Sequence, residues 1–322
     1  MAKIISLTEH PKGKGFLNFP VSLDLDNLNA DIAILGVPHG MPYDIKEYPN
    51  DQSTTPDLLR QNAQDAAWEE PRTVQHFDWD LGGPLLDNKD IKVIDCGNVT
   101  YDISDPKEHY IRAEKVANKI FSSNATLISI GGDHGIPIPI MRSLPKNNPI
   151  TLIQIDAHMD WREEVNGIKD GYSSPIRRAS ELEFIDSIFQ IGLRGVGSGR
   201  QEEVKDAMSY GSNIITAYDV HKKGINHILE MIPDKSLFYV TVDADGLDPT
   251  IMPAVNAPTP GGLNWTQVRE LIHGIVKKGK VLGFDIVEIS PSLENGNTTF
   301  IHAERLICNF IGAMVRAGYY NK

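Results

Sequence analysis

Short apolar segments alternate with longer segments of helical periodicity along most of the chain. Eight runs of five to seven residues are largely apolar and end at loop-forming residues, which is typical of strands that are covered on both faces. These predicted strands are 31–37, 91–95, 125–130, 151–155, 187–193, 213–217, 237–242 and 281–287.

Two segments near the carboxyl end have the clearest helical spacing. In Trp265–Lys278 the apolar residues recur every three and four positions, and Asn264 with Gln267 three residues later predicts an N-terminal cap. The segment Thr298–Ala317 has the same spacing and a higher apolar content. We expect this second helix to be buried or to contact another subunit.

Strands that alternate with helices predict a parallel sheet built from βαβ units. A closed (β/α)8 barrel and an open doubly wound sheet both fit the pattern, and both place function at the carboxyl ends of the strands. We expect one domain over residues 1–322, with residues 1–30 as an N-terminal extension packed on it. The polar segment Glu47–Arg72 is predicted to be mostly loop and to border the active site as a lid.

Composition narrows the class of protein. The chain has 322 residues, of which 41% are hydrophobic, and a formal net charge of −12. This charge disfavours nucleic acid and acidic membranes as partners. No apolar run approaches the roughly 20 residues of a membrane helix, and Met1–Ser6 lacks a signal-peptide core. We therefore expect a cytoplasmic protein, in which Cys96 and Cys308 are small core residues.

Three predicted strands are followed by histidine and aspartate residues, which are common metal ligands in proteins. Gly131-Gly132-Asp133-His134 follows the third strand, and the fourth and seventh strands run into acidic residues at alternate positions, which point the same way in an extended backbone. So many charged groups at one sheet edge would repel each other without a cation. The mixed oxygen and nitrogen ligands suit two first-row metal ions. The six candidates are His134, Asp156, His158, Asp160, Asp243 and Asp245.

These motifs resemble the three signatures of the ureohydrolase family, which includes arginase and agmatinase. The resemblance rests on GGDH at 131–134, DAHMD at 156–160 and DADGLDP at 243–249, and it extends to 192–195 and 281–291. Agmatinase-like members are the most similar. The resemblance implies an arginase-like, three-layer α/β/α domain with an open, eight-stranded parallel sheet, and a homo-oligomer that is a trimer or a hexamer.

The resemblance also implies a binuclear manganese centre, for which nickel is an alternative. One ion would be held by His134, Asp156, Asp160 and Asp243, and the other by His158, Asp156, Asp243 and Asp245. Two such ions lower the pKa of the water between them, so that hydroxide attacks the guanidinium carbon and the products are urea and an amine. Glu288 matches the carboxylate that pairs with the guanidinium group, and Asp160 is the candidate relay for the proton.

The sequence departs from the family around the substrate. Tyr172 stands where agmatinase-like sequences have a histidine, and Val255-Asn256-Ala257-Pro258 replaces a run with two hydroxyl residues. Candidate substrate contacts are therefore Asn256 and the aromatic residues Trp161 and Tyr172, which are able to stack on a guanidinium face. Glu163 and Glu164 are candidates for binding a distal ammonium group, although a solvated pair is the simpler interpretation.

The leading hypothesis is a metal-dependent amidinohydrolase that cleaves a small guanidino amine or acid, such as agmatine, with arginine disfavoured. One alternative keeps the metal ions but takes an amidine or formimidoyl substrate, which gives formamide in place of urea. Another alternative is a catalytically silent homologue that binds guanidinium ligands. The expected partner is a small guanidino compound, with no nucleic acid and no membrane.

Overall fold

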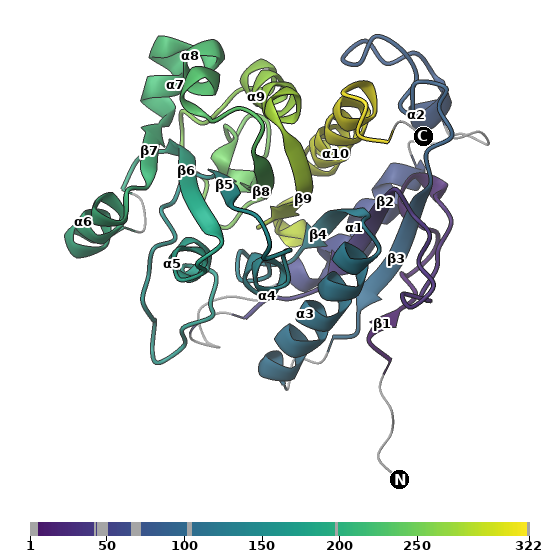
Figure 1. Cartoon of the computed structure of the whole chain (residues 1–322), viewed down its shortest axis with the longest axis horizontal. Coiled ribbons are helices and arrows are strands. Elements are labelled where there is room, and N and C mark those ends of the chain that lie inside the picture. Colours follow the sequence, from purple (N-terminus) through teal and green to yellow (C-terminus); the bar gives the residue numbers. More distant parts are fainter. Residues whose placement is uncertain are drawn as a thin grey trace.

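The protein is built around one mostly parallel sheet, seen in a computed structural model that describes residues 6–41, 43, 51–65, 72–101, 105–196 and 199–320 (Figure 1). Within these residues the sheet has nine strands in the order β1-β3-β2-β4-β9-β8-β5-β6-β7. The strands are β1 (Thr8–Glu9), β2 (Ile32–Val37), β3 (Val93–Val99), β4 (Thr126–Gly131), β5 (Ile150–Ile155), β6 (Ile185–Leu193), β7 (Asn213–Thr216), β8 (Leu237–Asp243) and β9 (Lys280–Val287).

The eight predicted strands are confirmed as β2 to β9, which all run parallel and form an open sheet rather than a barrel. The ninth strand, β1, has only two residues and pairs antiparallel with β3 at one edge. Alternate residues of the strands face opposite sides. Ile32 and Ile34 of β2 enter one apolar core, and Ala33 and Leu35 enter the other.

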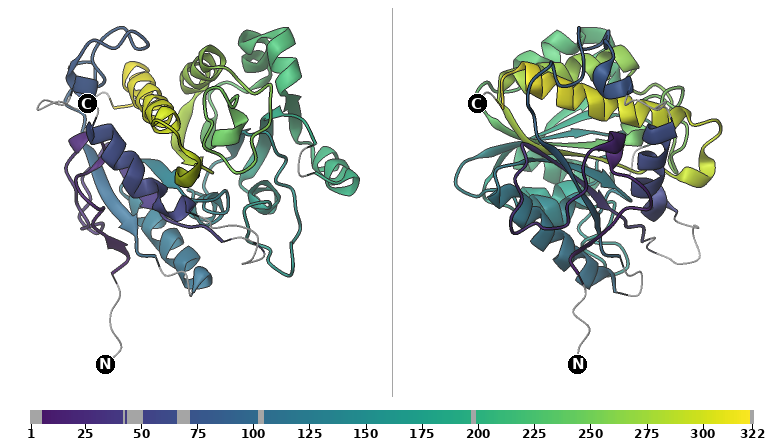
Figure 2. Two further views of the ribbon diagram at one scale, coloured as in Figure 1. Left: turned by 180° about the vertical axis from the view of Figure 1, so that it is seen from behind. Right: turned by 90° about the vertical axis from the view of Figure 1, so that its right-hand side faces the viewer.

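Helices cover both faces of the sheet, which makes the three layers visible in Figure 2. One core is closed by α1 (Thr55–Asp65), α7 (Ala217–Lys223), α8 (Ile225–Met231), α9 (Trp265–Lys278) and α10 (Thr298–Arg316). The other core is closed by α3 (Pro106–Ser122), α4 (Pro137–Arg142), α5 (Pro175–Ser180) and α6 (Gln201–Tyr210). The short helices are α2 (Arg72–Gln75), η1 (Phe16–Asn18), η2 (Gln52–Thr54), η3 (Ala244–Gly246) and η4 (Pro291–Leu293).

Both predicted helices near the carboxyl end are confirmed. Helix α9 spans the predicted residues, and its capping box joins Asn264 and Gln267 through two backbone-to-side-chain hydrogen bonds of 3.0 Å. Helix α10 ends at Arg316 and is largely buried, with Phe310 stacked on Phe284 of β9 at a ring distance of 3.8 Å. Among the described residues, no helix is long and apolar enough to cross a bilayer.

The prediction of a loop over Glu47–Arg72 was wrong for its central part, because η2 and α1 occupy residues 52–65. Residues 47–50 and 66–71 lie outside the described residues. The helix escaped the hydrophobic pattern because part of its buried face is charged. Arg60 of α1 is completely buried and binds Asp95 of β3, which is also completely buried.

This ion pair fastens α1 to the sheet. The guanidinium of Arg60 donates two hydrogen bonds to the carboxylate of Asp95, at 2.8 and 2.9 Å, and a third to Asn98 Oδ1 at 2.6 Å. Asp95 also accepts the backbone N–H of Phe16 at 2.8 Å. Because η2 leads directly into α1, the same pair fixes the position of Gln52, which contacts the functional site.

Arg60→Met should lower the free energy of unfolding by about 3–5 kcal/mol, because it leaves the Asp95 carboxylate buried without its cation. Urea denaturation followed by circular dichroism measures this change. Lys223→Met is the matched control, since Lys223 pairs with Asp219 at 2.9 Å on the surface and its loss should cost less than about 1 kcal/mol. Equal losses in the two variants would contradict a structural role for the buried pair.

Candidate metal centre

The candidate site lies at the carboxyl ends of four neighbouring strands, in the order β4-β9-β8-β5 (Figure 1). The segment that follows each strand carries part of the predicted set. His134 follows β4, Glu288 follows β9, Asp243 and Asp245 end or follow β8, and residues 156–160 follow β5. The fold therefore brings together all six predicted ligands and the predicted substrate carboxylate.

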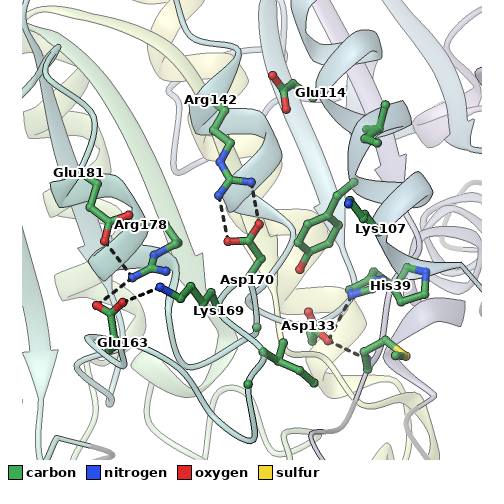
Figure 3. Close-up of a pocket in the computed structure, with 17 residues that line it drawn as sticks. His39, Lys107, Glu114, Asp133, Arg142, Glu163, Lys169, Asp170, Arg178 and Glu181 are labelled. Carbon is green, nitrogen blue, oxygen red and sulfur yellow. Dashed lines mark hydrogen bonds and ion pairs between the residues drawn. The ribbon is translucent and has the colours of Figure 1, made fainter.

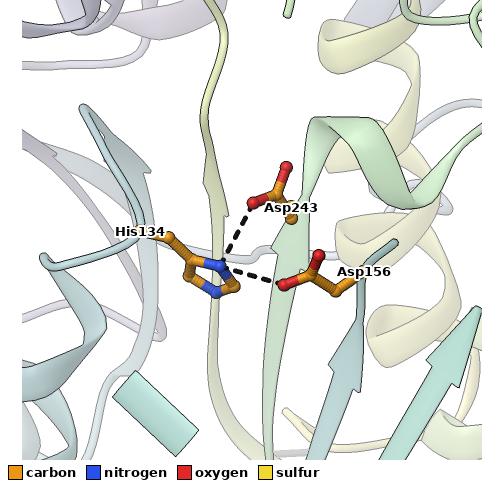
Figure 4. A group of neighbouring side chains, drawn as sticks. All are labelled: His134, Asp156 and Asp243. Atoms are coloured by element: carbon orange, nitrogen blue, oxygen red, sulfur yellow. Dashed lines mark ion pairs between the residues drawn. The ribbon is translucent and has the colours of Figure 1, made fainter. Parts of the chain in front are cut away.

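His134 stands at the centre of the first group. Its Nδ1 atom lies 2.8 Å from Asp160 Oδ2 and 3.1 Å from oxygens of both Asp156 and Asp243. Figure 4 shows the side chains of Asp156 and Asp243 converging on this nitrogen from their separate strands. The imidazole and both of these carboxylates are buried, so solvent does not separate the charges.

The other nitrogen of His134 is oriented by a chain of hydrogen bonds. Thr241 donates its hydroxyl proton to Asp285 at 2.7 Å, so its oxygen accepts from His134 Nε2 at 2.9 Å. A neutral imidazole carries only one N–H, and Nδ1 then has no hydrogen-bond partner of suitable geometry. An imidazole nitrogen that faces three carboxylates needs a positive charge between them, either a proton or a metal ion, and this arrangement fits a metal ion.

The second group is built on His158. Its Nδ1 atom lies 3.0 Å from Asp245 Oδ2 and 3.7 Å from Asp156 Oδ1. Asp156 thus turns one oxygen toward His134 and the other toward His158, and it belongs to both groups of potential ligands. Asp243 lies within reach of the first group in the described structure, and its Oδ1 atom accepts the backbone N–H of Asp245 at 2.9 Å.

Crowded negative charge perturbs the titration of the whole site. Burial, followed by the charges of Asp160 and Asp245, raises the pKa of Asp156 to about 7. Burial opposes a charge on His134, but the carboxylates around it outweigh this effect and hold its pKa well above the usual range. For His158 burial is likewise outweighed, mainly by Asp245, and its pKa rises to about 9. The protein without metal therefore retains protons where a metal ion would otherwise sit.

Support behind these side chains comes from polar residues that the sequence analysis did not single out. Gln154 donates to Asp156 Oδ2 at 2.6 Å and accepts from Gln190 at 2.7 Å. Asp285 accepts from Tyr239 at 2.6 Å as well as from Thr241. All are fully buried. Their only signal in the sequence is a polar residue inside an otherwise apolar strand.

Two residues of the site have a backbone conformation that is unusual for side-chain-bearing residues. Asp160 has φ 50° and Glu288 has φ 64°, both in the left-handed region, where strain of about 1–3 kcal/mol is retained only if the surroundings enforce it. The surroundings do so for Glu288. Its carboxylate accepts a hydrogen bond from the backbone N–H of His134 at 2.7 Å and another from the side-chain amide of Gln52. Burial, followed by the charge of Asp133, raises the pKa of Glu288 to about 8.

The predicted substrate contacts occupy different surroundings. Tyr172 is partly buried, and its ring centre lies 4.5 Å from that of Tyr43. Trp161 is 3% exposed and belongs to the apolar core, where it contacts Tyr210. Trp161 therefore has the surroundings of a packing residue. Asn256 is exposed on a loop that is held beside the end of β9 by the bridge between Val255 and Ile289.

Glu163 is engaged by cations of the protein itself. Its carboxylate lies 3.1 Å from Lys169 and 3.0 Å from Arg177, with Arg178 at 3.5 Å. These ion pairs already compensate the negative charge of Glu163, which a distal ammonium group of a ligand would need as its partner.

A cavity of about 900 Å³ lies near the predicted metal ligands, since Asp133, which precedes His134 in the chain, lines it. Its walls include Met41, Asp133 and Gly171, but none of the six predicted metal ligands. Ion pairs line it, among them one between Arg142 and Asp170 at 2.7 Å and one between Arg178 and Glu181 at 2.9 Å (Figure 3). The cavity is therefore next to the candidate centre and distinct from it.

Comparison with known proteins gives consistent results. Residues 30–312 match the model of a protein family described as the arginase family. An agmatinase of Salmonella paratyphi B is 28% identical over 299 residues, which cover 91% of this chain and 90% of the agmatinase.

Solved structures show the same similarity. The agmatine ureohydrolase of Thermoplasma volcanium has a TM-score of 0.74 and 29% identity, with 92% of this chain and 94% of that chain covered. The proclavaminate amidino hydrolase of Streptomyces clavuligerus has a TM-score of 0.80 with 96% and 99% covered. Its identity is 23%, so this second likeness concerns the fold alone.

Thr241→Val should weaken metal binding by about 10- to 100-fold, because it removes the hydrogen bonds that orient His134. Titration of the metal-free protein with Mn²⁺ by isothermal calorimetry measures the affinity. Thr151→Val is the matched control, since Thr151 is a buried threonine at the other end of the neighbouring strand β5. An unchanged affinity in Thr241→Val would show that the hydroxyl does not act on the site.

Proposed function

The chain belongs to the arginase family, whose hydrolases act on amidino C–N bonds, and we propose that within this family it cleaves a small guanidino compound to urea and an amine. One observation carries the proposal. Asp156 joins two groups of metal-binding side chains, and Glu288 is held beside them by the backbone of His134. A cation site and a carboxylate for a planar cation thus lie side by side.

The proposed centre holds two Mn²⁺ ions, with Ni²⁺ as the alternative. When bound, the two ions supply a water molecule activated for attack on the guanidinium carbon. The proposed first group of ligands is His134, Asp156, Asp160 and Asp243, and the second is His158, Asp156, Asp243 and Asp245. The lone Nδ1 of His134 and the two-sided position of Asp156 support this assignment.

Glu288 is proposed to bind and orient the guanidinium group. Each of its oxygens already accepts one hydrogen bond from the protein, and each retains a lone pair for an N–H of the substrate. This partly buried carboxylate has a raised pKa, and a bound guanidinium cation favours its ionised form. The Glu288 carboxylate is therefore suited to bind a planar cation.

Asp160 is proposed to move the proton from the attacking water to the leaving amine. Its Oδ2 atom lies 2.8 Å from His134 Nδ1, and its left-handed backbone directs the side chain into the cluster. The histidine that agmatinase-like sequences have at position 172 is replaced here by Tyr172. The proton path therefore depends on a carboxylate in this protein.

Urea release from a panel of agmatine, guanidinobutyrate, guanidinopropionate, guanidine and arginine tests the function on the metal-reconstituted protein. Urea from at least one of these compounds is expected. No urea from any of them would overturn the proposal, and formamide released from a formimidoyl compound would favour an amidine hydrolase instead.

Two variants should separate metal binding from substrate binding. Asp156→Asn should lose both metal and activity, because a neutral amide does not bridge two dications. Glu288→Gln should keep its metal and lose about 10²- to 10³-fold in kcat/KM, because a buried charge pair with the substrate is broken. Metal analysis and urea release give the two readouts. Full activity in Asp156→Asn would contradict the shared ligand.

We also propose a homo-oligomer, either a trimer or a hexamer. Phe77 and Trp79 support an apolar contact surface, since they are 57% and 89% exposed and their rings lie 5.0 Å apart. Light scattering coupled to size exclusion should give three or six times the mass of the chain. A mass of one chain would exclude this assembly.

A further inference from the structure

Tyr43 connects the two loops that carry His134 and Tyr172. Two residues before it, the backbone N–H of Met41 donates to Asp133 Oδ2 at 2.9 Å, next to His134 in the chain. Tyr43 itself accepts the backbone N–H of Ser173 on its phenol oxygen, also at 2.9 Å. The position of Tyr43 is thus fixed relative to both sides of the candidate centre.

The loop with Tyr172 lies against Asp160. Ser173 accepts the backbone N–H of Arg162 at 3.0 Å, and Asp160 accepts that of Arg177 at 3.2 Å. Tyr43 is bound to this loop by its hydrogen bond with Ser173. Both tyrosines therefore belong to the part of the structure that packs on the segment around Asp160.

The two tyrosine rings contact each other. Their centres are 4.5 Å apart with an angle of 41° between the planes. Gly171 allows this approach, because a Cβ atom there would lie 2.4 Å from both Cε1 and the phenol oxygen of Tyr43. Gly171 and Met41 also line the 900 Å³ cavity. The ring pair is therefore adjacent to that cavity through Gly171, which precedes Tyr172 in the chain.

We propose that Tyr43, acting through Tyr172, determines specificity by closing the substrate site beside Asp160. The inference rests on the proposed function and names the substrate class, a guanidino compound with a short, uncharged substituent or none. Two aromatic rings fill the space more rigidly than the histidine of agmatinase-like sequences would. Glu163 and Asp170 of the same loop are already paired with lysine or arginine, so neither is available for a charged tail.

Substrate selectivity of Tyr43 variants tests this proposal. The measured quantity is kcat/KM for guanidinobutyrate and agmatine, each divided by the value for guanidine. Tyr43→Ala should raise both ratios by about tenfold or more, because it removes the ring that packs on Tyr172 and leaves room for a longer tail. Tyr43→Phe retains the ring and should keep the ratios within about twofold of the wild type. Metal content should not change in either variant.

Tyr210→Ala is the matched control, since Tyr210 is a tyrosine of helix α6 whose ring contacts Trp161. It should change stability without changing the ratios. Unchanged ratios in Tyr43→Ala, or a wild type that prefers agmatine to guanidine, would contradict the proposed role of Tyr43 while leaving the proposed function intact.

Calorimetric binding of the same compounds to the metal-loaded protein decides the case in which nothing is hydrolysed. The proposed function would then be contradicted. The proposed role of Tyr43 would hold only if Tyr43→Ala binds agmatine about tenfold more tightly than the wild type, relative to guanidine. An unchanged relative affinity would contradict the proposed role of Tyr43 as well.

Discussion

Negative charge gathered at one buried sheet edge is the constraint on which the rest of the structure depends. Asp156, Asp160, Asp243 and Asp245 follow rigid parallel strands or their immediate ends, so the carboxylates have no freedom to move apart. Burial in a low-dielectric interior makes their mutual repulsion costly. The surrounding glutamines, threonine and tyrosine hold the geometry, so the charge is balanced either by bound protons or by a cation at the centre.

A comparison within the same molecule separates a metal centre from a structural ion pair. Asp95 is as deeply buried as Asp156, but it receives the two-pronged guanidinium of Arg60 and a backbone N–H. Its charge is fully compensated by the protein. Asp156 receives a neutral glutamine amide, a backbone N–H and two imidazoles that it shares with other carboxylates. Incomplete compensation by the chain itself is what marks the second case as a site for a ligand.

The sequence predicts the parts of this protein that follow a simple physical pattern. All eight parallel strands could be located, because strands buried on both faces are continuous apolar runs, and the ligands could be located because they directly follow such runs. The choice of an open sheet needed the family resemblance, since periodicity is the same in a barrel. Helix α1 was missed because Arg60 resembles a surface residue, and its partner Asp95 lies 35 positions away. The contact between Tyr43 and Tyr172 depends on a loop path that no local pattern specifies.

The left-handed backbone at Asp160 and Glu288 has a consequence for how this protein evolves. Glycine adopts this conformation without strain, so a change to glycine at either position would relieve the backbone. The same change would remove a carboxylate from the site. Selection for a more stable fold and selection for turnover thus act in opposite directions on the same two codons, and a thermostable descendant must find its stability elsewhere in the chain.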